Sequence, residues 1–418
     1  MLIISRKVTG MIFFGVLFIA GVWIGYHYQT TRFKIGEHYF DMDPYAKINP
    51  EKRYQLEMWD YDWPESNYQS KVNLALVDFQ KRYPNIKVTV KWLDWSNGEQ
   101  LLKDALVKGA APDVYCSAYD FPSFNYKFQI PVGPFLNESE RKTYDLALTD
   151  ICSINGVLGY IPRWVSLKLW LGNPVLLEKC GYSALKIQNE GLGWPDLNKI
   201  GNTLPEKTYI LVGNPKSIFS EGKFFNFTSD VEKSKLIENI LILKNINKTK
   251  KIPSDYNTNM IERFILGETA VICGIRPVLY KEIKKIMETR KINWSPLLMS
   301  YPLGVDGKGY QPIETGLISI YRNRRTKGND HIVAAFKLGQ FLSSDKNLNA
   351  FWQEKGLVSG YLGFGRTGRM NQHYQNILKR VKFGYLNTND QQEYFDRLFK
   401  KMIDEKSTIE EIAELQKK

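Results

Sequence analysis

Between residues 56 and 120 the hydrophobic pattern changes repeatedly from that of a strand to that of a helix. An apolar strand at 56–59 precedes a polar and aromatic loop at 60–66, and apolar side chains then recur at helical spacing, at positions 72, 75, 76 and 79. Apolar residues at 86, 88, 90 and 92 alternate with polar ones, which predicts a half-buried strand. A second helix with apolar residues from 101 to 106 and a short strand at 111–115 follow. This order predicts parallel strands with ligand-binding loops at their carboxyl ends.

The first 31 residues predict a membrane anchor. No charged residue occurs from Val8 to Thr31, and about 20 apolar residues cross a bilayer as a helix. Arg6 and Lys7 before this stretch suit a cytoplasmic amino end. No cleavage site of small residues is evident, so we expect an uncleaved signal-anchor helix at about residues 8–28 rather than a removed signal peptide. The polar segment 32–53 is then expected to be a tether, and the bulk of a single-pass chain to lie outside the cell.

Length, composition and charge describe a soluble globular part with two cores. The 418 residues exceed what one hydrophobic core usually supports, and 43% hydrophobic with 24% charged residues is typical of globular proteins. The formal charge of +13 comes from lysines and arginines without interleaved aromatic residues or a nucleic-acid motif. We therefore expect solvated basic faces, or attraction to anionic lipid or cell-wall polymer, and no nucleic-acid partner.

Neither the cysteines nor the glycines predict a cofactor site. The cysteines at 116, 152, 180 and 273 form no C-x-x-C pair and lack a histidine at ligand spacing, so no metal or dithiol redox site is expected. Disulfides and buried reduced thiols both remain open. The G-x-G-x-x-G match at 363–368 follows a predicted helix rather than a strand, so it does not predict a dinucleotide site.

Three linked segments carry a resemblance to a known family. "MWDYDW", "LVDFQKRYPNIKVTV" and "LVKGAAPDVYCSAYD" occur in the order and spacing of the extracellular solute-binding proteins of family 1, which serve sugar-importing ABC transporters and include maltose-binding protein. Later segments, among them "FILGETAVICG" and "ETGLISI", extend the resemblance over about residues 54–415.

The resemblance implies an α/β periplasmic-binding-protein fold of two hinge-linked lobes, preceded by the transmembrane helix. The first lobe is expected at 54–164 plus 319–370, and the second at 165–318 plus 371–418. A carbohydrate ligand is expected in the cleft, the transmembrane subunits of an ABC permease are expected partners, and the chain is expected to be a monomer.

Sugar binding requires aromatic planes for the apolar ring faces and polar groups for the hydroxyls. On this basis, and by position in the family pattern, eight residues are candidate ligand contacts: Tyr61, Trp63, Tyr119, Asp120, Trp164, Ser166, Arg276 and Glu314. The alternatives are core packing for the two tryptophans and a helix cap for Asp120. Arg276 replaces the aromatic residue usual in the family and can bind a carboxylate or phosphate bidentately, which suggests an acidic or substituted sugar.

Two other function classes remain as alternatives. One is a sensor or wall-associated binding protein that does not serve transport. The other is a carbohydrate-active enzyme that uses Asp60 and Asp62, or Asp120 with Glu314, as acid and base. No residues at nucleophile-base spacing support the enzyme, so catalysis is not expected.

Overall fold

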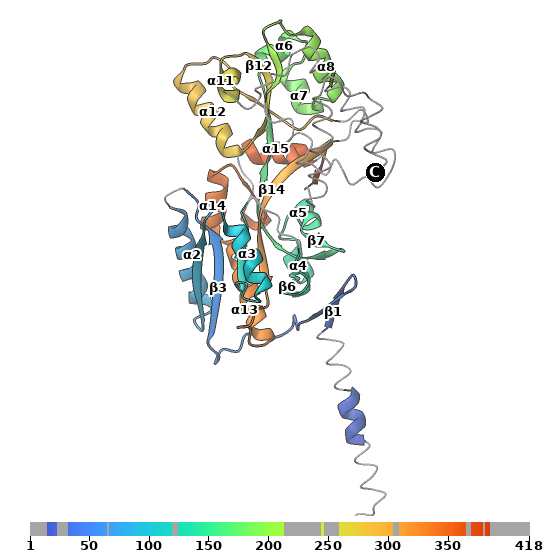
Figure 1. Ribbon diagram of the computed structural model, residues 1–418, viewed down its shortest axis with the longest axis vertical. Coiled ribbons are helices and arrows are strands. Elements are labelled where there is room, and N and C mark those ends of the chain that lie inside the picture. Colours follow the sequence, from blue (N-terminus) through green and yellow to red (C-terminus); the bar gives the residue numbers. More distant parts are fainter. Residues whose placement is uncertain are drawn as a thin grey trace, which may run out of the picture. The chain divides into compact units, whose positions relative to one another are not determined.

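The computed structural model describes residues 15–22, 32–64, 67–118, 124–212, 244–245, 259–303, 309–364, 369–378 and 381–384. Within them the chain forms two compact units, shown in Figure 1. Unit 1 comprises described residues of Met1–Ala118, Phe124–Pro162 and Leu317–Leu348, and unit 2 those of Arg163–Gly316 and Asn349–Lys418. The predicted changes of lobe are at 164/165, 318/319 and 370/371, whereas the units change at 162/163, 316/317 and 348/349.

Unit 1 is an α/β unit that begins with a hairpin. In chain order its elements are β1 (Arg32–Ile35), β2 (His38–Asp41), β3 (Tyr54–Tyr61), α2 (Tyr68–Arg82), β4 (Ile86–Leu93), α3 (Gly98–Val107), β5 (Val114–Cys116), β6 (Gln129–Ile130), η1 (Gly133–Phe135), α4 (Glu138–Arg141), α5 (Leu146–Ile151), β7 (Ser153–Ile154), β8 (Val157–Leu158) and α13 (Asn329–Ser344). Three further elements, β9 (Ile161–Leu167), β14 (Gly309–Tyr321) and α14 (Lys346–Glu354), contain the boundaries with unit 2.

The sheet of unit 1 is built around β3. This strand pairs in parallel with β4 along its whole length and with β5, and β14 pairs antiparallel with β5. The strand–helix–strand–helix–strand unit and its parallel pairing, both predicted from the periodicity, are therefore confirmed.

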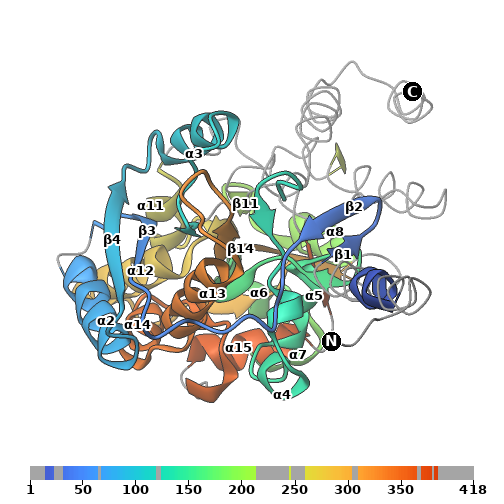
Figure 2. The same cartoon turned by 90° about the horizontal axis from the view of Figure 1, so that it is seen from below.

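Alternation along β3 directs its side chains to two different helices. Tyr61 faces α3, where its ring contacts the start of the helix at Gly98. Asp60 faces α2 and accepts a hydrogen bond of 2.6 Å from the hydroxyl of Tyr68. Helices α2 and α3 consequently cover opposite faces of the sheet, as Figure 2 shows.

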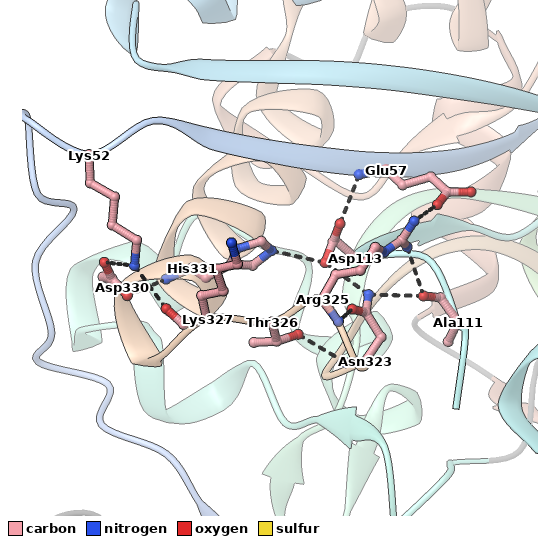
Figure 3. A network of polar contacts seen from close by, with 10 residues as sticks. All are labelled: Lys52, Glu57, Ala111, Asp113, Asn323, Arg325, Thr326, Lys327, Asp330 and His331. Atoms are coloured by element: carbon pink, nitrogen blue, oxygen red, sulfur yellow. Dashed lines mark hydrogen bonds and ion pairs between the residues drawn. The ribbon is translucent and has the colours of Figure 1, made fainter. Parts of the chain in front are cut away.

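A buried polar network joins the amino ends of β3 and β5 to the chain that follows β14 (Figure 3). One carboxylate oxygen of Asp113 accepts the backbone N–H of Glu57 at 2.8 Å. The other lies 3.0 Å from the amide nitrogen of Asn323 and 3.0 Å from Nε2 of His331. Asp113 and His331 are buried, so these contacts satisfy a carboxylate that water does not reach. The network fixes the edge of the sheet opposite to the carboxyl ends of the parallel strands.

The segment 32–53, expected from the sequence to be a tether, contains a hairpin. Strands β1 and β2 pair antiparallel, and Ile35, Phe40 and Met42 are buried in unit 1. Further along, the ammonium group of Lys52 lies 2.6 Å from a carboxylate oxygen of Asp330. The sequence pattern missed the hairpin because each of its strands is only four residues long.

Residues 15–22 are helical. Within the described residues, no helix has both the length and the apolar character needed to cross a membrane. Most of the expected anchor at about residues 8–28 lies outside the described part of the chain.

Unit 2 has a second mixed sheet, in the order β11-β12-β10-β13. Its elements are β10 (Leu169–Gly172), α6 (Pro174–Lys179), α7 (Ala184–Glu190), α8 (Trp194–Thr203), β11 (Tyr209–Val212), α11 (Met260–Ile265), β12 (Thr269–Ile275), α12 (Pro277–Thr289), β13 (Leu297–Met299), β15 (Val358–Ser359), η2 (Leu362–Phe364), α15 (Arg369–Leu378) and β16 (Val381–Gly384). Strand β11 is parallel to β12, whereas β10 is antiparallel to β12 and β13. The predicted C-terminal helices at 390–415 lie outside the described residues.

None of the four cysteines forms a disulfide. Three of them are buried, and Cys180 is partly buried. Burial raises the pKa of the thiols of Cys152 and Cys180, because an apolar environment disfavours the thiolate. Of the two alternatives left open by the sequence, the structure has the reduced thiols.

Candidate functional site

In unit 1 the carboxyl ends of the parallel strands β3 and β4 lie side by side. Their pairing runs from Tyr54 with Ile86 to Tyr61 with Leu93, so both strands end at the same level. In sheets of this kind, ligands bind in the loops beyond the carboxyl ends of parallel strands. The relevant loops are the one after Tyr61, described as far as residue 64, and the one from Asp94 to Asn97.

Aromatic side chains gather at this edge. Trp95 follows β4, and its ring centroid lies 5.3 Å from that of Tyr61 and 5.3 Å from that of Trp63. Its indole N–H donates a hydrogen bond to the backbone carbonyl of Asp62 in the loop after β3. The two loops are thus joined by one tryptophan.

The two predicted aromatic contacts in this unit are both buried. Tyr61 is 3% exposed and its hydroxyl lies 3.0 Å from that of Tyr115, while Trp63 is 5% exposed and packs against Tyr68 and Trp95. They therefore support the edge of the sheet from inside unit 1.

Two further candidates, Tyr119 and Asp120, lie outside the described residues. Asp60, a carboxylate of the enzyme alternative, is buried and accepts hydrogen bonds from the Tyr68 hydroxyl and the Tyr61 N–H.

In unit 2 the structure brings Arg276 and Glu314 together. Arg276 directly follows β12, at the carboxyl end of the parallel pair β11 and β12. Its Nε and Nη2 donate to the two carboxylate oxygens of Glu314 at 3.1 and 2.9 Å, which is a bidentate pair. Nζ of Lys168 lies 3.0 Å from the same carboxylate.

The charges of this cluster do not cancel. Two cationic side chains, Arg276 and Lys168, share the carboxylate of Glu314, so the formal charge of these three side chains together is +1. The side chains of Lys168 and Glu314 are 12% and 14% exposed, whereas that of Arg276 is 49% exposed. Arg276 is therefore the member of the cluster that presents positive charge to solvent.

The remaining two candidates, Trp164 and Ser166, are completely buried in β9. The indole of Trp164 lies against the backbone of Gly316 and its ring is 5.8 Å from that of Trp352. The hydroxyl of Ser166 has no hydrogen-bond partner among the described residues. A buried hydroxyl in this condition suits a water molecule or a ligand group.

Unit 2 also contains a cavity of about 140 Å³ formed by α7, β13 and α15. Its polar lining consists of Gln188, Ser300, Gln372, His373 and Asn376, and three aliphatic side chains complete it. The lining holds no Asp, Glu, Lys or Arg, so it suits an uncharged group that both donates and accepts hydrogen bonds.

Sequence reasoning missed Trp95 and the residues of this cavity. For Trp95 a signal was present, because it stands directly beyond the predicted strand 86–92 and that strand was expected to be parallel to its neighbour. For the cavity the sequence held no such signal, because the cavity is lined by residues more than 180 positions apart in the sequence.

Comparisons with known proteins address the fold. Residues 62–136 match the family model described as bacterial extracellular solute-binding protein. The resemblance to this family is confirmed. No curated protein sequence matched the chain.

Solved structures of solute-binding proteins match nearly the whole chain. The sugar-binding protein MalE from the phytopathogen Xanthomonas citri superposes with a TM-score of 0.69 at 16% identity, over 87% of this chain and 95% of that one. A family 1 extracellular solute-binding protein from Bifidobacterium longum subsp. infantis superposes with a TM-score of 0.65 at 14% identity, over 87% of this chain and 98% of that one. An ABC substrate-binding protein from Listeria monocytogenes, solved in complex with cycloalternan, superposes with a TM-score of 0.59 at 14% identity, over 88% of this chain and 98% of that one. The chain thus has the α/β fold of the solute-binding proteins.

Proposed function

We propose that this protein is an extracellular carbohydrate-binding protein that delivers its ligand to an ABC importer. The observation that carries the proposal is the fold shared with MalE and with the cycloalternan-binding protein over nearly nine-tenths of the chain. The family match at 62–136 covers the carboxyl ends of β4 and β5, the region in which the sequence predicts ligand contacts.

The proposed ligand contacts differ between the two units. The sequence proposes Tyr119 and Asp120 as contacts, and Tyr61 and Trp63 are the aromatic support of the loops of unit 1. Unit 2 contributes Ser166, Trp164 and the pair Arg276 and Glu314. The uncharged cavity of unit 2 is a further candidate for a hydroxyl-rich group, because carboxamide, imidazole and hydroxyl groups can each bind a sugar hydroxyl.

Binding in this proposal makes and breaks no bond. Two carboxylates of the enzyme alternative are already engaged within the protein: Asp60 with Tyr68, and Glu314 with Arg276 and Lys168. Ligand binding would shift the protein towards a form that the permease recognises, and release to the permease would complete the cycle.

Residues 8–28 hold the protein in the membrane in this proposal, with everything after residue 31 outside the cell. The absence of charge from Val8 to Thr31 supports it.

An acidic sugar is a second candidate ligand class, favoured by the formal charge of +1 on the cluster of Lys168, Arg276 and Glu314. The half-exposed guanidinium of Arg276 is the group that would meet a carboxylate.

A thermal-shift screen against neutral and uronic-acid oligosaccharides tests the function. A ligand at 100 times its Kd stabilises the native state by about 2.7 kcal/mol and raises the Tm. We expect stabilisation by at least one oligosaccharide, which should be recovered intact after incubation. Stabilisation by amino acids or peptides alone would contradict the proposal. If the ligand is acidic, Arg276→Ala should weaken binding of the uronic-acid oligosaccharides and leave that of neutral ones unchanged.

A further inference from the structure

We propose that Trp95 is a stacking platform on unit 1 for a neutral sugar ring. The inference rests on the proposed carbohydrate function and deepens it, because it names a contact residue and the chemical class of the group that the residue contacts.

Trp95 differs in exposure from two other tryptophans of unit 1, Trp59 and Trp63. Its side chain is 42% exposed, whereas Trp59 and Trp63 are each 5% exposed. Among the tryptophans in the described part of the chain, Trp95 is the one that is exposed to this degree. An indole of this exposure has an apolar surface available to a ligand, which the buried rings do not.

The orientation of the exposed ring is fixed before any ligand arrives. Trp63 packs edge-on against it with an interplanar angle of 84°, and Tyr61 contacts it at 47°. The indole N–H is held by the carbonyl of Asp62. A ring held on several sides loses little conformational freedom when a ligand stacks on it.

The backbone that carries Trp95 is also held. The carboxylate of Asp94 accepts hydrogen bonds of 2.8 Å from the N–H and from the hydroxyl of Ser96, and the Asp94 carbonyl accepts the N–H of Gly98 at 2.9 Å. The hydrogen bonds from Ser96 lower the pKa of Asp94, so its carboxylate is ionised at neutral pH.

The surroundings select a neutral, hydroxylated ring. The apolar face of a pyranose matches an indole plane, and the exposed side chains of Asp62 and Asp94 stand in the two loops that hold the ring. Both are hydrogen-bond acceptors for hydroxyl groups, and both would repel a uronic acid. The position beyond the carboxyl ends of β3 and β4 is where ligands bind in parallel sheets.

Calorimetric titration of the full-length protein and three variants tests the platform, with maltotriose, cycloalternan and trigalacturonic acid as probes. Trp95→Ala should raise the Kd for a neutral glycan about tenfold, because loss of one aromatic contact removes roughly the free energy of a tenfold change. Trp95→Phe should retain part of the affinity, since phenylalanine still stacks. Tyr45→Ala, at an aromatic residue of unit 1 that is 82% exposed and far in sequence from these loops, should bind like the wild type.

Iodide quenching of tryptophan fluorescence gives a second readout. Bound glycan should protect the wild type from quenching and should have little effect in Trp95→Phe, where the exposed indole is absent. If Trp95→Ala binds every glycan that the wild type binds with unchanged affinity, the role of Trp95 as a platform is overturned and the carbohydrate function is not. If the wild type binds none of the three glycans, the carbohydrate function fails and the platform fails with it.

Discussion

At the scale of single residues, close packing sets which side chains the protein tolerates. A Cβ atom placed on Gly316 would lie 2.3 Å from two atoms of the Trp164 indole, closer than any real contact. Trp164 is completely buried and cannot move into solvent. The absence of a side chain at position 316 is therefore what allows β14 to pass the indole.

Gly316→Ala should destabilise the protein by about 1 to 3 kcal/mol, because overpacking in a filled core forces side chains from their preferred rotamers. Urea unfolding followed by fluorescence measures the change. The matched control is Gly201→Ala in α8, where the nearest atom would be Ile210 Cδ1 at 3.4 Å. Alanine suits a helix better than glycine, so the control should be neutral or stabilised by up to about 1 kcal/mol. An equal decrease in the free energy of unfolding of Gly316→Ala and Gly201→Ala would contradict the packing argument.

The sequence did not predict which individual aromatic residues are buried. Tyr61 and Trp63 follow a predicted strand and have the chemistry of a sugar site, yet both are covered by residues of other elements. Trp95, which the sequence analysis did not select, is the exposed one. Periodicity reports which side of an element a residue occupies, whereas exposure depends on tertiary contacts that one segment does not encode.

At the scale of elements, the alternation between strand and helix periods was enough to predict β3, α2, β4, α3 and β5 with their parallel pairing. Each of the first four is eight or more residues long, so its period is visible. The hairpin β1–β2 was missed because four-residue strands show too few repeats, although Gly36 at a φ of 58° marks its turn.

The segment after this hairpin is held to α13 through Asp330. Burial alone would raise the pKa of Asp330, but hydrogen bonds from Lys52 and Tyr54 outweigh it and lower the pKa below its ordinary value. A lowered pKa in the folded state means that the ionised carboxylate stabilises the fold above the ordinary pKa of about 3.8, and that this stability is lost as the pH falls through the lowered value.

Lys52→Ala should therefore lower the free energy of unfolding by roughly 0.2 to 1 kcal/mol at pH 7, the range of partly exposed ion pairs. Below pH 4 the difference from wild type should shrink as the pH falls through the lowered pKa of Asp330, because its carboxylate then becomes protonated in both proteins. Urea unfolding across this pH range provides the measurement. Lys47→Ala, at an exposed lysine of the same segment, is the control and should match the wild type. If the free energy of unfolding of Lys52→Ala stays below that of the wild type by a constant amount down to pH 2, lost packing rather than lost charge is responsible.

At the scale of the whole molecule, two features could each bring the protein to a membrane. One is the uncharged stretch from Val8 to Thr31, and the other is the formal charge of +13. They act through different forces: burial of apolar side chains in the bilayer does not weaken with salt, whereas attraction of basic side chains to anionic lipid is screened within about 3 Å at 1 M ionic strength. Salt therefore separates the two contributions.

We expect the full-length protein to stay in the membrane fraction after washes with 1 M sodium chloride and with alkaline carbonate, and to be extracted by detergent. A chain that starts at residue 32, exported with a cleavable signal peptide, should be released into the soluble fraction at physiological salt and should bind the same glycan with the same Kd. This follows because the truncation removes the apolar stretch and retains the hairpin β1–β2 and both units. Release of the full-length chain by salt alone would assign the attachment to its basic surface, and retention of the truncated chain in the membrane fraction would do the same.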